Sequence, residues 1–477
     1  MTMGSLRSKA FAKLLALYII WILLSGAAVA QPAVYFPFVH TPEIDLPVYA
    51  RFRAEGMPFS EAFWHGFKYV AKYRNKRFSA PPEEIRYYDA QRKLLRFLAA
   101  EPVDPVHNLH ANLAMVGDIM WIRSDWDSFL AKEILDSLNR FDVVLGNLET
   151  VISPNFKVRG FWPDYRTYNS HPDLLNSFRR HNGGNIFTAL SIANNHTMDY
   201  SDRGILDTIE FLDGNRILHS GVGTSKAGKR YTTFVRNGIK FGFYAATYGL
   251  NDPGEGRRTK LNLNILPGLA PETETAVDIS QVRAVLAAMD EEGVDFKIVS
   301  LHWGFEYEFY PSPKTMQVGR EIVAAGADVI MGSHPHLVQP SEVCYVNGYE
   351  ERHGRLKDQF AAMNHPTGCV LKDGNGKPRK ALILYSLGNF TTAMYTFFCE
   401  VGIIQQVRVT KNEASGAVDW GLPGYELVYN LRSDPITKRR MILPMDNYLR
   451  QNCRQKECPE DVVQSVAFLH RHLRGAE

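Results

Sequence analysis

The stretch SPKTMQVGREIVAAGADVIMGSHPH, residues 312–336, places a helix pattern directly before a strand pattern. Ser312 is a typical N-cap, Pro313 is favoured at the first helical position, and Gly326 commonly follows the last helical turn. The short apolar run at 327–332 then predicts a buried strand. A helix that leads straight into a buried strand is the repeating unit of an α/β domain.

The same alternation extends along the chain in both directions. Short apolar runs predict further strands at 112–117, 141–146, 185–193, 240–247, 296–301 and 381–387. Amphipathic segments between them predict helices at 125–140, 202–214 and 280–293. We therefore expect an α/β fold.

Polar residues follow five of the predicted strands. They are Asp118; Asn147 and Glu149; Asn194, Asn195 and His196; His302; and His334 and His336. Each alone is more often a turn residue or an ordinary histidine, but loops at the carboxyl ends of strands are where α/β proteins gather ligands. Carboxylate, amide and imidazole groups are ligands for Zn, Mn or Fe, and one carboxylate can bridge two ions.

The SHPH turn has two histidines separated by one residue. The period of two sends His334 and His336 to the same side, so both could face one cluster. The residues at the strand ends therefore predict a metal site that can activate water and bind the oxygens of a phosphoryl or acyl group.

Six segments resemble, in order, the motif series of the CapA family of capsule or poly-γ-glutamate synthesis proteins, within the calcineurin-like metallophosphoesterase superfamily. They are VGDIM, GNLE, SIANNHTMDY, VSLHWGFEY, GADVIMGSHPH and YSLGNF, spread over residues 111–395. The resemblance implies a four-layer α-β-β-α sandwich, with two mixed sheets flanked by helices and a dinuclear metal site at one edge.

The resemblance also implies a role for each site residue. By motif, Asp118 and His336 resemble first-metal ligands, Asn147 and Glu149 lie where a bridging carboxylate is expected, and Asn195, His302 and His334 resemble second-metal ligands. His196 resembles the catalytic histidine that protonates the leaving group or steadies the transition state, and Asp199 is placed to orient it.

Met120 departs from the superfamily pattern, whose first motif is Asp-x-His. A thioether is a poor ligand for these divalent ions, so the first metal position is expected to be weak. Glu149 would have to replace the usual bridging aspartate. We expect one or two divalent ions, Mn, Zn or Fe, per chain.

The N-terminus has the pattern of an export signal. Arg7, Lys9 and Lys13 precede the apolar run 14–30, which ends in Ala-Val-Ala. This pattern predicts a signal peptide over residues 1–30, with an uncleaved membrane anchor as the alternative. We expect the protein in the periplasm or cell envelope. The net charge of +3 gives no reason to expect a nucleic-acid partner.

The rest of the chain divides around the motif region. Residues 31–110 form an N-terminal extension with helical patterns, and 396–477 begin with a strand pattern and end in a helix that completes the domain. Within the domain at 111–395, residues 341–380 read as an insertion, expected beside the metal site.

Five cysteines allow at most two disulfides. Cys453 with Cys458 and Cys344 with Cys369 are candidate pairs, and reduced thiols are equally consistent with the sequence.

Two functions remain open at this point. The first is an exported CapA-like protein that acts on an envelope polymer such as poly-γ-glutamate, through attack of activated water on a phosphoester or amide with His196 as the acid. The second is a non-catalytic, metal-stabilised partner of a membrane polymer synthesis or export complex, which Met120 favours.

Overall fold

The computed structural model describes most of the chain beyond the N-terminus. It covers residues 80–473 except 101–107, 123, 159–166, 226–227, 271–274, 350–368, 375, 395–396, 432–439, 454–465 and 471. The predicted signal peptide at 1–30 and residues 31–79 of the extension lie outside the described residues. No helix within the described part is long and apolar enough to cross a membrane.

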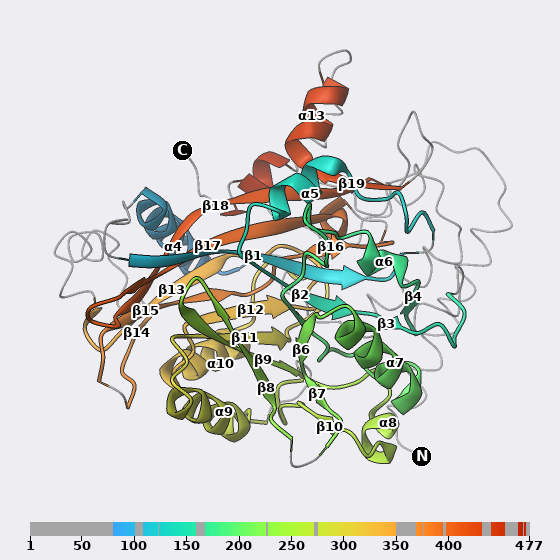
Figure 1. Cartoon of the computed structure of the whole chain (residues 1–477). Coiled ribbons are helices and arrows are strands. Elements are labelled where there is room, and N and C mark those ends of the chain that lie inside the picture. The colour runs from blue at the N-terminus through green and yellow to red at the C-terminus, as the bar shows by residue number, and fades with distance from the viewer. Residues whose placement is uncertain are drawn as a thin grey trace, which may run out of the picture.

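Two large sheets organise the molecule (Figure 1). The first has eight strands in the order β19-β18-β17-β1-β2-β5-β6, and β16 also pairs with β1. These strands are β1 Asn108–Met120, β2 Val143–Glu149, β5 Ala189–Ser191, β6 Leu218–Ser220, β16 Asn389–Thr391, β17 Val401–Asn412, β18 Val418–Leu431 and β19 Met441–Pro444. β1, β2, β5 and β6 are parallel, whereas β17, β18 and β19 continue the sheet in antiparallel pairs.

The second sheet has seven strands in the order β14-β13-β15-β12-β11-β9-β8. They are β8 Tyr231–Arg236, β9 Ile239–Thr247, β11 Phe296–His302, β12 Val329–Ser333, β13 Ser341–Val346, β14 Val370–Leu371 and β15 Arg379–Leu384. β9, β11, β12 and β15 are parallel. Two short pairs complete the strands, β3 Val151–Ile152 with β4 Asn169–Ser170, and β7 Val222–Gly223 with β10 Asn262–Leu263.

The helices are α4 Pro82–Ala100, α5 Lys132–Leu138, α6 Asp173–Asn176, α7 Ser201–Gly214, α8 Pro253–Arg258, α9 Ser280–Glu291, α10 Pro313–Ala324 and α13 Met445–Cys453, with a 3-10 turn at Phe397–Glu400. The cap predicted for α10 is confirmed, because Ser312 accepts a hydrogen bond from the backbone N–H of Thr315. The helix predicted at 125–140 is shorter than expected. Asp125 has a positive φ of 63°, and Leu130 forms a bridge with Ile442, so the helix begins only after these residues.

Alternation along β1 shows how the layers pack. Leu113 and Met115 face the core between the two sheets, whereas Ala114 and Val116 face a second core covered by α5, α6 and α7. Helices α9 and α10 cover the outer face of the seven-stranded sheet (Figure 1). The predicted α/β class and four-layer α-β-β-α arrangement are therefore confirmed.

The described parts of the extension and of the C-terminal segment are built into this sandwich. In α4, Tyr88 and Leu94 are fully buried, and the helix contacts β13 of one sheet and β18 of the other. Oε1 of Gln91, in α4, accepts a hydrogen bond from the backbone N–H of Val343 at 2.9 Å. The C-terminal segment supplies β17, β18 and β19 beside β1.

The described parts of the predicted insertion at 341–380 are strands of the seven-stranded sheet. Cys344 and Cys369 form a disulfide, as one of the candidate pairings anticipated. β13 runs antiparallel to β15, with Val346 opposite Arg379, so the chain leaves the sheet at the amino end of β15. β13 begins with Ser341 opposite Leu384, at the carboxyl end of β15, and runs away from the metal edge. Residues 350–368 lie outside the described residues, so the expected place of the insertion beside the metal site stays a prediction. The side chains of Cys453 and Cys458 lie outside the described residues.

Candidate metal centre

The carboxyl ends of parallel strands from both sheets meet at one site. Asp118 belongs to the last residues of β1, Glu149 ends β2, His302 ends β11, and His334 directly follows β12. The sequence patterns placed these polar residues in the loops after the strands. The structure instead places four of them within the strand ends, namely Asp118, Asn147, Glu149 and His302. Hydrogen bonding between strands fixes their backbones, which suits a site that needs fixed ligands.

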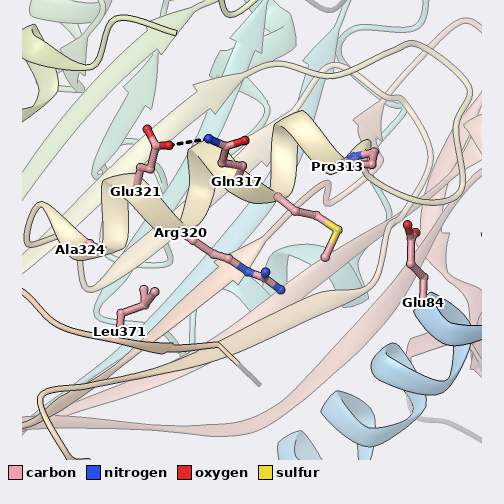
Figure 2. Close-up of a pocket in the computed structure, with 8 residues that line it drawn as sticks. Glu84, Pro313, Gln317, Arg320, Glu321, Ala324 and Leu371 are labelled. Carbon is pink, nitrogen blue, oxygen red and sulfur yellow. Dashed lines mark hydrogen bonds between the residues drawn. The ribbon is translucent and has the colours of Figure 1, made fainter. Parts of the chain in front are cut away.

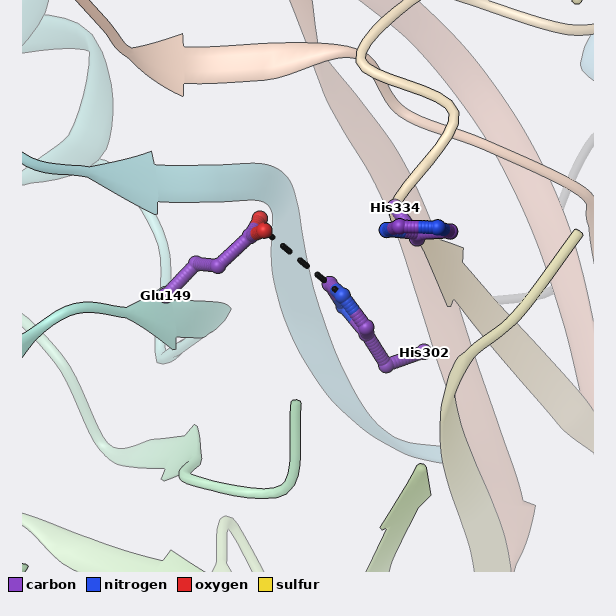
Figure 3. A group of neighbouring side chains, drawn as sticks. All are labelled: Glu149, His302 and His334. Carbon is purple, nitrogen blue, oxygen red and sulfur yellow. Dashed lines mark ion pairs between the residues drawn. The ribbon is translucent and has the colours of Figure 1, made fainter. Parts of the chain in front are cut away.

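Six buried side chains form three overlapping triads. In each triad one ligand atom per residue lies within 4.8 Å of the others. The triads are Glu149, His302 and His334 (Figure 3); Asp118, Glu149 and His336; and Glu306, His334 and His336. Each pair of triads shares one residue, so the six side chains make a single cluster, which we call the metal cluster.

Glu149 is the residue that joins the two sides of this cluster. Its Oε1 lies 3.6 Å from Nε2 of His302 and 4.0 Å from Nε2 of His336. Glu149 therefore occupies the position in which a bridging carboxylate was expected. A carboxylate can bridge two ions with its two oxygens.

Asp118 is held by groups from β2 and from the SHPH turn. Its oxygens accept hydrogen bonds from Nδ2 of Asn147 at 2.9 Å and from the backbone N–H of His334 at 3.1 Å, and Nδ1 of His336 lies 3.4 Å away. Burial raises the pKa of Asp118, but His336, His302 and the Asn147 amide outweigh it and hold the pKa below its usual range. The carboxylate is thus ionised, which is the form that binds metal.

His302 is oriented by partners on both ring nitrogens. Nε2 lies 2.8 Å from Oδ1 of Asn195, and Nδ1 lies 3.0 Å from Oγ of Ser333. Burial, against the opposing charge of Asp118, lowers the pKa of His302 to about 3. The ring is therefore neutral at ordinary pH, as a metal ligand must be.

His334 and His336 both face the metal cluster, but not through strand alternation. Their φ angles are 93° and 58°, in the left-handed region that non-glycine residues rarely adopt. The period-of-two argument for the SHPH turn was therefore wrong in its geometry, although its outcome holds. Nδ1 of His336 lies 3.0 Å from Oδ1 of Asn389, which fixes the orientation of that ring. Backbone strain of this kind gathers at functional sites.

His196 lies beside the metal cluster and has its own set of partners. Its Nδ1 is 2.6 Å from Oδ2 of Asp199, its ring stacks on Tyr168 with centroids 3.9 Å apart, and Nδ2 of Asn251 lies 3.2 Å from Nδ1. Burial raises the pKa of Asp199, and His196 and the backbone N–H of Tyr168 oppose that rise. The predicted pairing of His196 with Asp199 is present.

The donor set fits a divalent cation. Oxygen and imidazole ligands suit Mn, Zn and Fe, and buried carboxylates are normally paired or coordinate metals. Met120 is buried, and its Sδ accepts a hydrogen bond from the hydroxyl of Thr392 at 3.7 Å. The cluster is therefore compatible with a divalent metal site to which Met120 adds no hard ligand.

Sequence reasoning missed Glu306, Asn389 and Asn251. Glu306 stands four residues after His302 in the same quoted motif, and its burial against two histidines has no signature in sequence periodicity. Asn389 could have been found, because it follows β15, another parallel strand that ends at the same edge. Asn251 follows β9 in the same way and also accepts a hydrogen bond from Nδ2 of Asn195 at 3.0 Å.

Two glycines allow backbones to approach closely beside the ligands. The N–H of Asp118 donates to the carbonyl of Gly388 at 2.9 Å, and a Cβ on Gly117 would lie 1.9 Å from that oxygen. A Cβ on Gly332, two residues before His334, would lie 2.1 Å from the carbonyl oxygen of Tyr385. Neither position has room for a side chain.

A separate pocket of about 410 Å³ lies along α10 (Figure 2). Its lining includes Arg320 of α10, Glu84 of α4 and Leu371 of β14, and it is distinct from the metal cluster. Glu342, Cys344 and Cys369 also group closely, but the two sulfurs form the disulfide and the carboxylate pairs with Arg320 at 2.6 Å. That group is therefore not a metal site.

The fold and the cluster define a four-layer α/β protein with a buried, mixed carboxylate and histidine site at the carboxyl edge of its parallel strands. A sequence profile of the family described as bacterial capsule synthesis protein PGA_cap matches residues 112–394, which is more than half of the chain. The chain belongs to this family, as the motif resemblance predicted.

Curated relatives share part of their length with the chain. The PGA biosynthesis protein CapA of Bacillus subtilis (strain 168) is 35% identical over 160 residues, which is 33% of this chain and 39% of that protein. The capsule biosynthesis protein CapA of Bacillus anthracis is 26% identical over 260 residues, which is 51% of this chain and 59% of that protein. A probable polyglutamine synthesis accessory protein of Mycobacterium tuberculosis (strain CDC 1551 / Oshkosh) is 27% identical over 212 residues, 42% of this chain and 52% of that protein. The matched regions thus span about half the length of these relatives.

Among solved structures, a novel phosphatase from Mycoplasma pneumoniae superposes with a TM-score of 0.36 and 11% identity, covering 72% of this chain and 97% of that one.

Proposed function

We propose that this protein takes part in the synthesis or export of a capsule-type envelope polymer such as poly-γ-glutamate, and that it hydrolyses a phosphoester or amide bond in that process. Membership of the capsule synthesis family and the names of the three relatives support the polymer. The proposed hydrolysis is supported by Glu149, a buried carboxylate that belongs to two groups of side chains able to hold a metal ion.

A bound pair of divalent ions, Mn, Zn or Fe, supplies Lewis-acid activation of water and of a phosphoryl or acyl oxygen. Asp118, Glu149 and His336 would hold one ion, and Glu149, His302 and His334 the other, with Asn195 beside His302. Asn147 would act on the first position by holding Asp118 in place.

His196 would hold the proton for the leaving group. Asp199 contacts Nδ1, so Nε2, which lies 3.3 Å from Nδ2 of Asn251, is the nitrogen that would transfer the proton. Stacking on Tyr168 fixes the plane of the ring. A positioned acid beside a cluster of this kind is the arrangement that hydrolysis of a phosphoester or amide requires.

The proposed location is the periplasm or cell envelope, reached through the N-terminal segment. The disulfide between Cys344 and Cys369 supports export, because disulfides persist mainly in oxidising compartments. Mass spectrometry of the mature N-terminus should find Gln31, and Met1 retained in the membrane fraction would indicate an uncleaved anchor. Full-length chain in the soluble cytoplasm would contradict export.

The competing function is a non-catalytic, metal-stabilised partner of a membrane polymer synthesis or export complex. Met120, which stands at a ligand position with its sulfur directed to Thr392, is the observation that favours it. Hydrolysis assays with a panel of phosphoesters and γ-glutamyl peptides, combined with metal analysis of the purified protein, test the two functions. Turnover that depends on metal supports the enzyme, and its absence from metal-loaded protein supports the partner.

In cells that make the polymer, His196→Ala and His334→Ala separate the same two functions. If both variants fail, the enzyme is supported. If only His334→Ala fails, the metal is structural. Normal polymer production by both variants would show that polymer production requires neither catalysis nor the metal.

A further inference from the structure

We propose that Glu306 is a metal ligand that replaces the histidine absent at position 120, so that the position defined by Asp118, Glu149 and His336 is complete. This inference rests on the metal-dependent function proposed above. It assigns a ligand role to a residue of the VSLHWGFEY motif, in the loop between β11 and α10, to which the motif resemblance gives no role.

The first support is the location of the Glu306 carboxylate. A carboxylate oxygen of Glu306 and one ring nitrogen from each of His334 and His336 lie within 4.8 Å of one another, and Glu306 is only 1% exposed. His336 also belongs to the triad with Asp118 and Glu149. Glu306 therefore lies beside His336 of the first metal position, and also beside His334 of the second.

The second support is the way the backbone holds this residue. The N–H of Trp303 donates to the carbonyl of Ser333 at 3.1 Å, and the N–H of Tyr307 donates to the carbonyl of Pro335 at 2.8 Å. These two bonds tie the loop to the SHPH turn on both sides of Glu306. Tyr307 has a φ of 68°, a left-handed conformation that is costly outside glycine.

The outer part of the same loop is fixed to the rest of the protein. The indole N–H of Trp303 donates to the carbonyl of Tyr385 at 3.0 Å, and Nε2 of Gln339 donates to the carbonyl of Glu308 at 2.8 Å. His472, near the C-terminus, contacts the carbonyl of Phe309 at 3.0 Å. Glu306 is thus placed before any ion binds, as a good ligand should be.

The third support is charge. Asp118, Glu149 and Glu306 place three buried carboxylates in one cluster. Buried carboxylates are costly unless cations or strong donors offset them. A second divalent ion would add positive charge beside these carboxylates, whereas the thioether of Met120 offers neither charge nor a hard donor. Glu306 and Met120 therefore have complementary roles, with the ligand moved from β1 to the loop after β11.

The test measures ions and not turnover. Wild type, Glu306→Gln and the matched control Glu308→Gln, a change at another buried glutamate of the same loop, are stripped of metal, loaded with Mn²⁺, dialysed and analysed for manganese per chain. We expect Glu306→Gln to lose one ion per chain, or to bind it roughly 10- to 100-fold more weakly, while Glu308→Gln matches wild type. If Glu306→Gln has the same manganese content as wild type, the inference about Glu306 is overturned, but the metal-dependent function is not. Wild type that binds no ion would instead overturn the metal-dependent function.

A second variant tests whether Glu306 provides the metal ligand that a histidine at position 120 would provide. Met120→His in the Glu306→Gln background should restore the lost manganese. A folded double variant, shown by an unchanged circular dichroism spectrum, that still lacks this ion would refute the replacement.

Discussion

Nε2 of His302 lies 3.6 Å from Oε1 of Glu149, and the two residues belong to different sheets. The metal cluster therefore exists only when the two sheets are packed against each other. An ion held by both residues would join the eight-stranded sheet to the seven-stranded sheet, so metal binding and packing of the sandwich are coupled.

We predict that metal raises the melting temperature of the protein. An ion bound only by the folded chain stabilises it by about 2.7 kcal/mol at 100 times its dissociation constant. Calorimetry of metal-stripped protein with and without added Mn²⁺ measures the shift. His334→Ala should reduce the shift, because it removes a ligand of one of the two ions, and His196→Ala should retain it in full. An equal shift in His334→Ala would mean that the ion binds elsewhere.

We predict that His196→Ala lowers metal-dependent turnover by roughly 10²- to 10⁴-fold, the usual contribution of a positioned acid. Metal content should be unchanged, because His196 lies beside the metal cluster and is held by Asp199 and Asn251. Asp199→Asn should give a smaller loss, since the ring remains but its orientation is weaker. Loss of metal from His196→Ala would show that the residue is a ligand and not an acid.

We predict that the Cys344–Cys369 disulfide contributes about 3 kcal/mol to the free energy of unfolding, given the length of loop that it closes. Denaturant titration with and without reductant measures this contribution. The double variant Cys344→Ala/Cys369→Ala should be insensitive to reductant. A wild-type midpoint that reductant leaves unchanged would contradict the prediction.

We predict that His472 makes stability depend on pH below neutrality. Burial, with Arg92 nearby, lowers the pKa of His472 to about 3 from an ordinary 6.5. Between these values the unfolded chain takes up a proton that the folded chain does not. Stability should therefore fall as pH falls through this window, by up to about 1.4 kcal/mol per pH unit from this residue.

His472→Gln tests this because the glutamine amide can still donate to the carbonyl of Phe309. Denaturant midpoints of the metal-stripped protein between pH 7 and pH 4.5 should give a shallower slope for the variant, by at most one proton. Identical slopes would mean that His472 titrates alike in the folded and unfolded chains.

The fold was predictable from sequence because its signals are local. All seven predicted strands are present as β1, β2, β5, β9, β11, β12 and β15, with ends shifted by a few residues. The cap and terminator of α10 were equally readable. The helix predicted at 125–140 is present only as α5, because a tertiary contact, Leu130 against Ile442, overrides local propensity before it.

The candidate site was only partly predictable. Parallel strands of one sheet share an edge, so Asp118 and Glu149 could be grouped without a structure. His302 lies in the other sheet, so only the motif resemblance grouped it with them. Glu306 could not, because its place depends on hydrogen bonds between its loop and the SHPH turn. The left-handed backbones of His334 and His336 likewise have no signal in residue type.

Gly117 and Gly332 set a limit on how this protein can vary. Neither has a functional group, yet any added carbon would push a neighbouring strand away from Asp118 or from the turn that carries His334. In a saturation mutagenesis screen scored by polymer production, these two positions should tolerate substitution as poorly as the ligands themselves. Mutational intolerance alone would then mark them as active-site residues, although their contribution is the space that they leave for two backbones to meet.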